Sequence, residues 1–156
     1  MYLLIQGGKQ LQTKAEYDPS KILDMLRKKG SAFEHNRQHD AHEAFIALIE
    51  LSKTLERQCT GTQENNTTCS MCKNVTVNKS EFNTLFLPCT GNFSDDLKLF
   101  FASSTIDDYQ CERCQSSCPA QLSTKLSKLP TYLVFKTNSR GIPLSFNVLT
   151  YTCDLI

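Results

Sequence analysis

Two short motifs decide how this sequence folds: Cys69-Ser70-Met71-Cys72 and Cys111-Glu112-Arg113-Cys114. In each motif the chain reverses over two residues and turns two thiol groups the same way, so that both can bind one metal ion. Two such knuckles supply the four soft ligands of a closed, tetrahedral zinc site, which leaves no coordination position for a reactive water. The sequence therefore predicts a structural zinc ion held by Cys69, Cys72, Cys111 and Cys114.

The segment between the two motifs spans roughly 40 residues, longer than the spacing of a compact zinc ribbon. It must therefore fold on itself to bring the knuckles together. Two other interpretations of the same cysteines stay open. Two disulfides would need an oxidising compartment, and a redox Cys-x-x-Cys pair belongs beside a βαβ pattern, which neither motif has.

The start of the chain favours a reducing compartment. Met1-Tyr2-Leu3-Leu4-Ile5 is apolar but too short for a signal-peptide core, and neither a basic region nor a small-residue cleavage site flanks it. We therefore expect the cytoplasm or the nucleus, where eight cysteines favour metal binding over disulfides. The remaining cysteines are expected to be ordinary thiols: Cys59, Cys89, Cys118 and Cys153.

Composition limits the class of protein. A chain of 156 residues with 40% hydrophobic residues suits one domain with a real core. Its net charge of +1 argues against a general nucleic-acid or membrane-surface role, which would need a basic excess. No apolar run approaches the length of a membrane span. We expect no nucleic acid and no membrane as partner, and a chain that is monomeric or part of a larger complex.

Two helices are predicted before the first knuckle. Residues 17–30 carry Asp18 as an N-terminal cap and Gly30 as a left-handed stop. Asp40 and Glu43 have the spacing of a capping box, and the apolar face of the helix that they begin is predicted to continue through Leu51 to Leu55. We expect surface or capping roles for the three histidines, His35, His39 and His42.

After these helices the pattern becomes that of strands. Residues 58–69 are polar and are predicted to form a loop. Ser94-Asp95-Asp96 is predicted to cap a short helix. Alternating or apolar runs predict strands, the third of them buried, at 75–77, 82–86, 132–135 and 143–156.

Taken in order, these features resemble the catalytic domain of the ubiquitin-specific proteases. Gln38-His39-Asp40-Ala41-His42-Glu43 is similar to the Gln-Gln-Asp-Ala-His-Glu box of that family, and the two knuckles resemble its zinc-binding fingers. Leu129-Pro130 before an apolar strand is similar to the family's entry into the palm. Asp154-Leu155-Ile156 resembles the end of one of its later strands.

The resemblance implies an α+β fold of the papain-like, hand-shaped type, present in part. Thumb helices would fill residues 1–58, a β-rich zinc-finger insertion residues 59–118, and the first palm strands residues 119–156. It also implies structural zinc as cofactor and ubiquitin or ubiquitinated proteins as partners.

The catalytic boxes of the family have no counterpart in this sequence. In the family a Cys thiolate attacks the isopeptide carbonyl and a His carries the proton. The nucleophile lies before the thumb helices and the His after the fingers, whereas here no Cys precedes Cys59 and no His follows His42. Along one continuous helix these two residues would lie about 25 Å apart. No catalytic residue is assigned, and we expect a truncated or non-catalytic member, inactive alone.

An alternative from another class is a zinc-ribbon module that binds ubiquitin or another protein without enzymatic activity. A ribbon that binds nucleic acid would need clustered Lys and Arg between the knuckles. Residues 73–110 offer only Lys73, Lys79 and Lys98.

Overall fold

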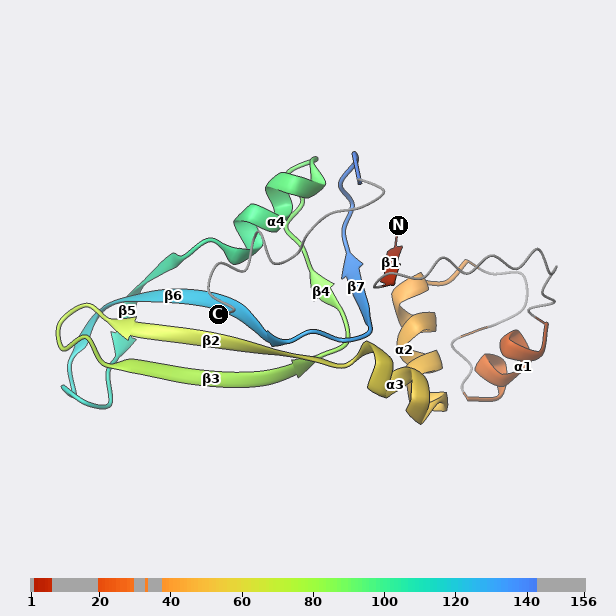
Figure 1. Ribbon diagram of the computed structural model, residues 1–156, viewed down its shortest axis with the longest axis horizontal. Coiled ribbons are helices and arrows are strands. Elements are labelled where there is room, and N and C mark those ends of the chain that lie inside the picture. Colours follow the sequence, from red (N-terminus) through yellow and green to blue (C-terminus); the bar gives the residue numbers. More distant parts are fainter. Residues whose placement is uncertain (1, 7–19, 30–32, 34–37, 143–156) are drawn as a thin grey trace.

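The structure is a computed structural model that describes residues 2–6, 20–29, 33 and 38–142. It is elongated, with the N-terminal helices at one end and a long sheet extending to the other (Figure 1). The helix predicted over residues 17–30 is α1 (Ser20–Lys29). Its predicted caps, Asp18 and Gly30, lie outside the described residues, as do Cys153 and the strands predicted over residues 143–156.

The strands form two sheets. A small sheet has the order β1-β7-β4, in which β1 is antiparallel and β4 parallel to the central strand. Its members are β1 (Tyr2–Gln6), β7 (Tyr132–Lys136) and β4 (Leu85–Phe86). The long sheet is antiparallel throughout, with the order β3-β2-β6-β5. Its members are β3 (Val75–Phe82), β2 (Gly61–Cys69), β6 (Ser117–Lys128) and β5 (Ser104–Gln110).

The second predicted helix begins where the sequence indicates but is not continuous. The Asp40 carboxylate caps α2 (Ala41–Leu51) by accepting the N–H of His42 at 2.7 Å. Ser52 then adopts an extended conformation, and its hydroxyl accepts the N–H of Leu55 at the start of α3 (Lys53–Cys59). The prediction of one helix to Leu55 is wrong because a Ser hydroxyl can replace the helical acceptors and start a new helix. Leu51 is exposed as a result, and Ile49 is the buried residue of α2.

The prediction of a loop over residues 58–69 is also wrong. Most of this segment is β2, which is hydrogen-bonded on both sides, to β3 and to β6. Its side chains are mostly half-buried on both faces, so the strand lacks the apolar alternation on which the prediction relied. Backbone pairing on two edges holds a strand whose own side chains are polar.

The short helix α4 (Phe93–Phe101) is capped by a residue that precedes the predicted cap. The side chain of Asn92 accepts the N–H groups of Ser94 and Asp95, at 2.9 and 3.3 Å. Asn92 therefore caps the helix in place of Ser94-Asp95-Asp96, and Asp96 is released to turn into the protein, where it is fully buried.

One apolar core joins the two sheets and α4. The buried strand predicted at residues 132–135 is confirmed as β7, in which Leu133, Val134 and Phe135 are buried. The ring of Phe135 meets that of Phe93 edge-on at 5.6 Å. Around them pack the other members of the cluster, from the long sheet, from β4 and the residue that follows it by one position, and from α4: Phe82, Leu85, Leu87, Leu97, Leu126. We call the end of the long sheet that enters this core its base, and the opposite end its tip.

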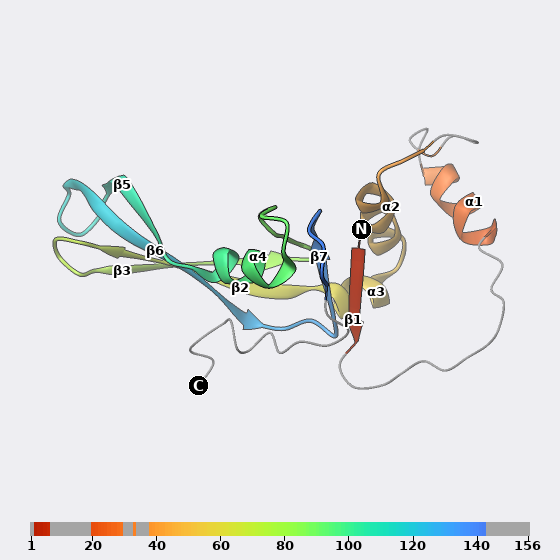
Figure 2. The same ribbon diagram turned by 90° about the horizontal axis from the view of Figure 1, so that it is seen from above.

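Between base and tip the long sheet is polar. Its one buried acid, Glu64, pairs with Lys79 of β3 at 2.6 Å and with Lys125 of β6 at 3.3 Å. The sheet twists strongly along its length (Figure 2). Near the tip its two edge strands approach one another, since Thr76 of β3 and Tyr109 of β5 share a hydrogen bond of 3.0 Å.

Asp96 links α4 to two other segments, the one just before the helix and the one that follows β7. One carboxylate oxygen accepts the N–H and the hydroxyl of Thr90, at 2.8 and 2.6 Å, and the other accepts the hydroxyls of Thr137 and Ser139. Burial alone would raise the pKa of Asp96, but the donors on Ser139 and Thr90 outweigh it and hold this pKa below its ordinary value.

We expect Asp96→Asn to lower the free energy of unfolding by about 2–3 kcal/mol, because an amide nitrogen would face hydrogen-bond donors. Asp95→Asn, on the exposed side of the same helix, is the matched control and should change it by no more than about 0.5 kcal/mol. Urea titrations of both variants measure the difference.

The difference in the free energy of unfolding between the wild type and Asp96→Asn should depend on pH. Because the folded-state pKa of Asp96 is lowered, its stabilisation is present above the ordinary Asp pKa and is lost as pH falls through the lowered value. The gap between the wild type and Asp96→Asn should therefore narrow in acid. A gap that is constant from neutral pH into acid would contradict this account.

Candidate metal centre

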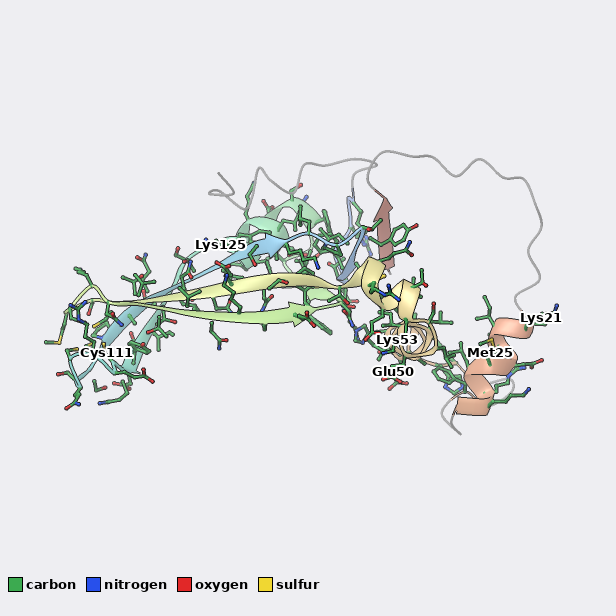
Figure 3. The ribbon with its side chains drawn as sticks, turned by 60° about the horizontal axis from the view of Figure 1, so that its bottom comes forward. Lys21, Met25, Glu50, Lys53, Cys111 and Lys125 are labelled. Carbon is green, nitrogen blue, oxygen red and sulfur yellow. The ribbon has the colours of Figure 1, made fainter. Side chains whose placement is uncertain are left out.

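The tip of the long sheet brings the two predicted knuckles together. Cys69 ends β2, and Cys72 lies in the turn that leads to β3; Cys111 and Cys114 lie in the turn between β5 and β6. Because β2 and β6 are antiparallel neighbours, the end of β2 lies beside the start of β6, and the turns of the two hairpins meet. Figure 3 shows Cys111 at the far end of the molecule from α1, which carries Met25.

The four sulfur atoms have the spacing of a tetrahedral metal site. All lie within 4.8 Å of one another. Across the two knuckles, Cys69 Sγ is 3.9 Å from Cys114 Sγ, and Cys72 Sγ is 3.6 Å from Cys111 Sγ. A zinc–sulfur bond of about 2.3 Å requires sulfurs about 3.8 Å apart in a tetrahedron. The cluster is thus able to hold zinc without rearrangement of the backbone.

The first cysteine of each knuckle has a lowered pKa. The backbone N–H of Cys72 is the main cause that lowers the pKa of Cys69 to about 6. In the same way the backbone N–H of Cys114 lowers the pKa of Cys111. Both sulfurs are fully buried, so these amide dipoles take the place of water in stabilising the negative charge.

The second cysteine of each knuckle keeps its proton in the metal-free protein. The N–H of Asn74 lowers the pKa of Cys72, but burial and the neighbouring thiols outweigh it and raise this pKa to about 11. Burial is the main cause that raises the pKa of Cys114. In each knuckle the first cysteine thus has a lowered pKa and the second a raised one, and a bound divalent cation would displace the remaining protons.

The backbone of the two knuckles is nearly the same. The N–H of Lys73 donates to the carbonyl of Cys69 at 3.1 Å, and the N–H of Gln115 donates to that of Cys111 at 2.8 Å. Lys73 and Gln115 both adopt left-handed conformations, with φ of 57° and 52°. This conformation suits glycine better than residues with a Cβ, so both turns carry strain that the surrounding hydrogen bonds maintain.

Cys118 is not the ordinary thiol that the sequence suggested. It is buried near the start of β6, with its sulfur 3.3 Å from Cys69 Sγ. The sequence did contain an indication of this position. Cys118 lies only four residues after Cys114, near the start of β6, and β6 pairs with the strand that ends at Cys69. The other described thiols lie apart from the tip: Cys59 is buried at the end of α3, and Cys89 is exposed.

The described histidines have packing roles. The ring of His39 lies 5.5 Å from that of Phe33, and the ring of His42 meets that of Phe86 edge-on at 5.1 Å. Within the described residues neither belongs to a metal-ligating group; His35 lies outside them. Burial raises the pKa of Cys59, which keeps its sulfur protonated and unreactive. None of the described helices is long and apolar enough to span a membrane.

Comparison with known families agrees with this architecture. The family model described as ubiquitin carboxyl-terminal hydrolase matches residues 2–140. The chain belongs to this family. The resemblance to the ubiquitin-specific proteases is thereby confirmed, and so is the α+β fold class, with helices beside an antiparallel, cysteine-tipped sheet.

A sequence relative and two solved structures illustrate the similarity. Probable ubiquitin carboxyl-terminal hydrolase 9 of Schizosaccharomyces pombe is 28% identical over an alignment of 137 residues, and the match covers 74% of this chain and 23% of the relative. A SAGA DUB module of Ubp8, Sgf11, Sus1 and Sgf73 bound to monoubiquitin matches with a TM-score of 0.69 and 19% identity, over 85% of this chain and 38% of that one. The module bound to ubiquitin aldehyde matches with a TM-score of 0.63 and 23% identity, over 74% and 30%.

This chain therefore corresponds to a part of each of these three proteins. It spans at most 38% of the solved chains and 23% of the curated relative. At these identities the solved structures establish the fold of the segment.

We expect Lys73→Gly to raise the free energy of unfolding by up to about 1 kcal/mol, because glycine adopts the left-handed conformation without strain. Lys73→Ala is the matched control: it removes the same side chain but keeps the Cβ, so it should leave stability within about 0.5 kcal/mol of the wild type. Denaturant titrations of the two variants test the strain. Equal stability of the two variants would show that the turn is not strained.

Proposed function

We propose that this chain is the zinc-stabilised, ubiquitin-binding part of a ubiquitin-specific protease domain. Residues 1–58 would form the thumb, apart from strand β1 of the small sheet. Residues 59–118 would form the fingers, whose strand β6 continues to Lys128, and residues 119–156 the start of the palm. Family membership supports this proposal, as do two solved structures of the same fold that were bound to ubiquitin or ubiquitin aldehyde. Cleavage of ubiquitin from protein conjugates by thiol chemistry is the activity we propose for the domain to which the segment corresponds.

The convergence of four sulfurs at the tip is the observation that carries the proposal. Cys69, Cys72, Cys111 and Cys114 would hold zinc, which would supply a cross-link between the two hairpins and no reaction. All seven described cysteines are free thiols. A reducing compartment, the cytoplasm or the nucleus, would keep the four ligands available.

The long sheet offers the surface that we propose for ubiquitin. Its edge strand β3 is exposed along nearly its whole length. Val75 and Val77 lie on the same face of that strand and are about half exposed. Met71 in the first knuckle is 64% exposed. Apolar groups held open to solvent on a rigid sheet favour contact with a protein partner.

We propose that this polypeptide binds ubiquitin without cleaving it. Catalysis of this type needs a thiolate with a histidine in reach. The buried Cys59 has a raised pKa, and the described histidines pack against aromatic rings. The four knuckle sulfurs would be occupied by metal.

Removal of the metal should unfold the tip selectively. Structural zinc contributes on the order of 10–16 kcal/mol in small finger peptides, against a net stability of about 5–15 kcal/mol for a domain. We expect a strong chelator or Cys111→Ser to abolish the circular dichroism of the long sheet while the signal of the N-terminal helices persists.

Cys89→Ser is the matched control, because Cys89 is exposed and lies outside the cluster. It should retain one zinc per chain by elemental analysis, together with the wild-type spectrum. A spectrum that the chelator leaves unchanged would contradict a structural role for the ion.

We expect labelled ubiquitin to bind the zinc-loaded chain saturably at physiological salt, and the Cys111→Ser variant to lose this binding while Cys89→Ser keeps it. DNA and RNA, measured in parallel, should show no saturable binding at that salt. A reporter attached to the ubiquitin C-terminus should not be released.

Saturable binding of nucleic acid in place of ubiquitin would favour the zinc-ribbon alternative. Thiol-dependent release of the reporter would contradict the proposal that the chain binds without cleaving.

A further inference from the structure

A fifth sulfur lies against the metal centre. The register of the long sheet pairs Cys69 of β2 with Ala120 of β6. Cys118 lies two residues from Ala120, so the alternation of the strand places it on the same face as Ala120 and Cys69. Its side chain is 5% exposed, and its sulfur is 3.3 Å from that of Cys69.

Cys118 touches one ligand and lies outside the ligand tetrahedron. The group of mutually close sulfurs consists of the four knuckle cysteines. Two sulfurs bound to one zinc ion lie about 3.8 Å apart, as the cross-knuckle pairs do at 3.6 and 3.9 Å. The Cys118–Cys69 separation is shorter, at 3.3 Å, and matches a hydrogen bond between a thiol and a thiolate.

The direction of this hydrogen bond follows from the metal. A zinc-bound Cys69 sulfur carries no proton, so the S–H of Cys118 must donate and Cys69 must accept. Cys69 then accepts a side-chain donor in addition to the backbone N–H groups of Cys72 and Met71. Its counterpart Cys111 accepts backbone N–H groups from Cys114 and Arg113, and its described side-chain contacts are with other ligand sulfurs.

We propose that Cys118 is a positioning residue of the metal centre, whose thiol donates a hydrogen bond to zinc-bound Cys69 and thereby strengthens binding of the ion. The inference rests on the zinc site proposed above. Four thiolates around a divalent cation carry an excess of negative charge, and a hydrogen-bond donor in contact with one of them stabilises that charge and fixes the orientation of the ligand.

Three substitutions in the full chain separate a hydrogen bond from simple packing. Cys118→Ala and Cys118→Val remove the donor, and Val fills the space; Cys118→Ser keeps a donor. We expect zinc affinity, measured by competition with a chromogenic chelator, to fall about 10- to 100-fold in the Ala and Val variants and to stay near the wild-type value in the Ser variant.

Packing alone predicts the reverse order. Val would then retain zinc, and Ser would lose it because a buried hydroxyl is less favourable than a thiol in an apolar contact. That order, or equal affinity in all three variants while the wild type binds one zinc, would overturn the inference and leave the zinc site standing. A wild-type chain that binds no zinc would overturn both.

Two further measurements support the assignment of the role. Substitution with cobalt should give the same thiolate-to-metal charge-transfer intensity in the wild type and in Cys118→Ser, because the number of bound thiolates is unchanged. A loss of about a quarter of this intensity would show instead that Cys118 is one of the four ligands. Cys59→Ala, which removes a buried thiol at the other end of the sheet, should leave zinc affinity unchanged.

Discussion

The meeting of four sulfurs at one point is the constraint on which the long sheet depends. Its middle has almost no apolar core, since residues 62–68 of the central strand β2 are polar and mostly half-buried. Glu64 and its two lysines hold three strands together there, but such pairs contribute little where water reaches them. A sheet with this composition must be fixed at its ends. The cysteine cluster fixes the tip.

The base is fixed by apolar packing combined with one buried carboxylate. Phe82 and Leu126 carry the long sheet into the same cluster that contains Phe135 of the small sheet. Gly61 permits this approach, because a Cβ at that position would lie 2.5 Å from the ring of Phe82. Asp96 then joins α4 to the segment that follows β7. The strands of the long sheet are thus held together at both ends, by apolar packing at the base and by the cysteine cluster at the tip. Such a sheet keeps its shape when a partner binds to its surface.

The sequence predicted what is decided locally and missed what is decided by neighbours. The Asp40 cap and the apolar run of β7 each follow from a few adjacent residues, and both are confirmed. The two knuckles, also visible in short motifs, come together at the tip. Strand β2 was missed because its stability comes from backbone pairing on both edges. The break at Ser52 and the cap at Asn92 depend on which of several nearby polar side chains accepts the first N–H groups of the helix. Cys118 was missed because its role depends on the register between β2 and β6.

The geometry of the tip also bears on the choice between zinc and disulfides that spacing alone leaves open. A disulfide within each knuckle would need no approach between two turns about 40 residues apart in sequence. Disulfides between the knuckles would join the four sulfurs in two separate pairs, and the two pairs would not need to surround a common point. Here the cross-knuckle distances are nearly equal, at 3.6 and 3.9 Å, and every sulfur is within 4.8 Å of the other three. Only a single ion at the centre uses all of these separations at once, and the amide dipoles aimed at Cys69 and Cys111 favour the thiolates that such an ion requires.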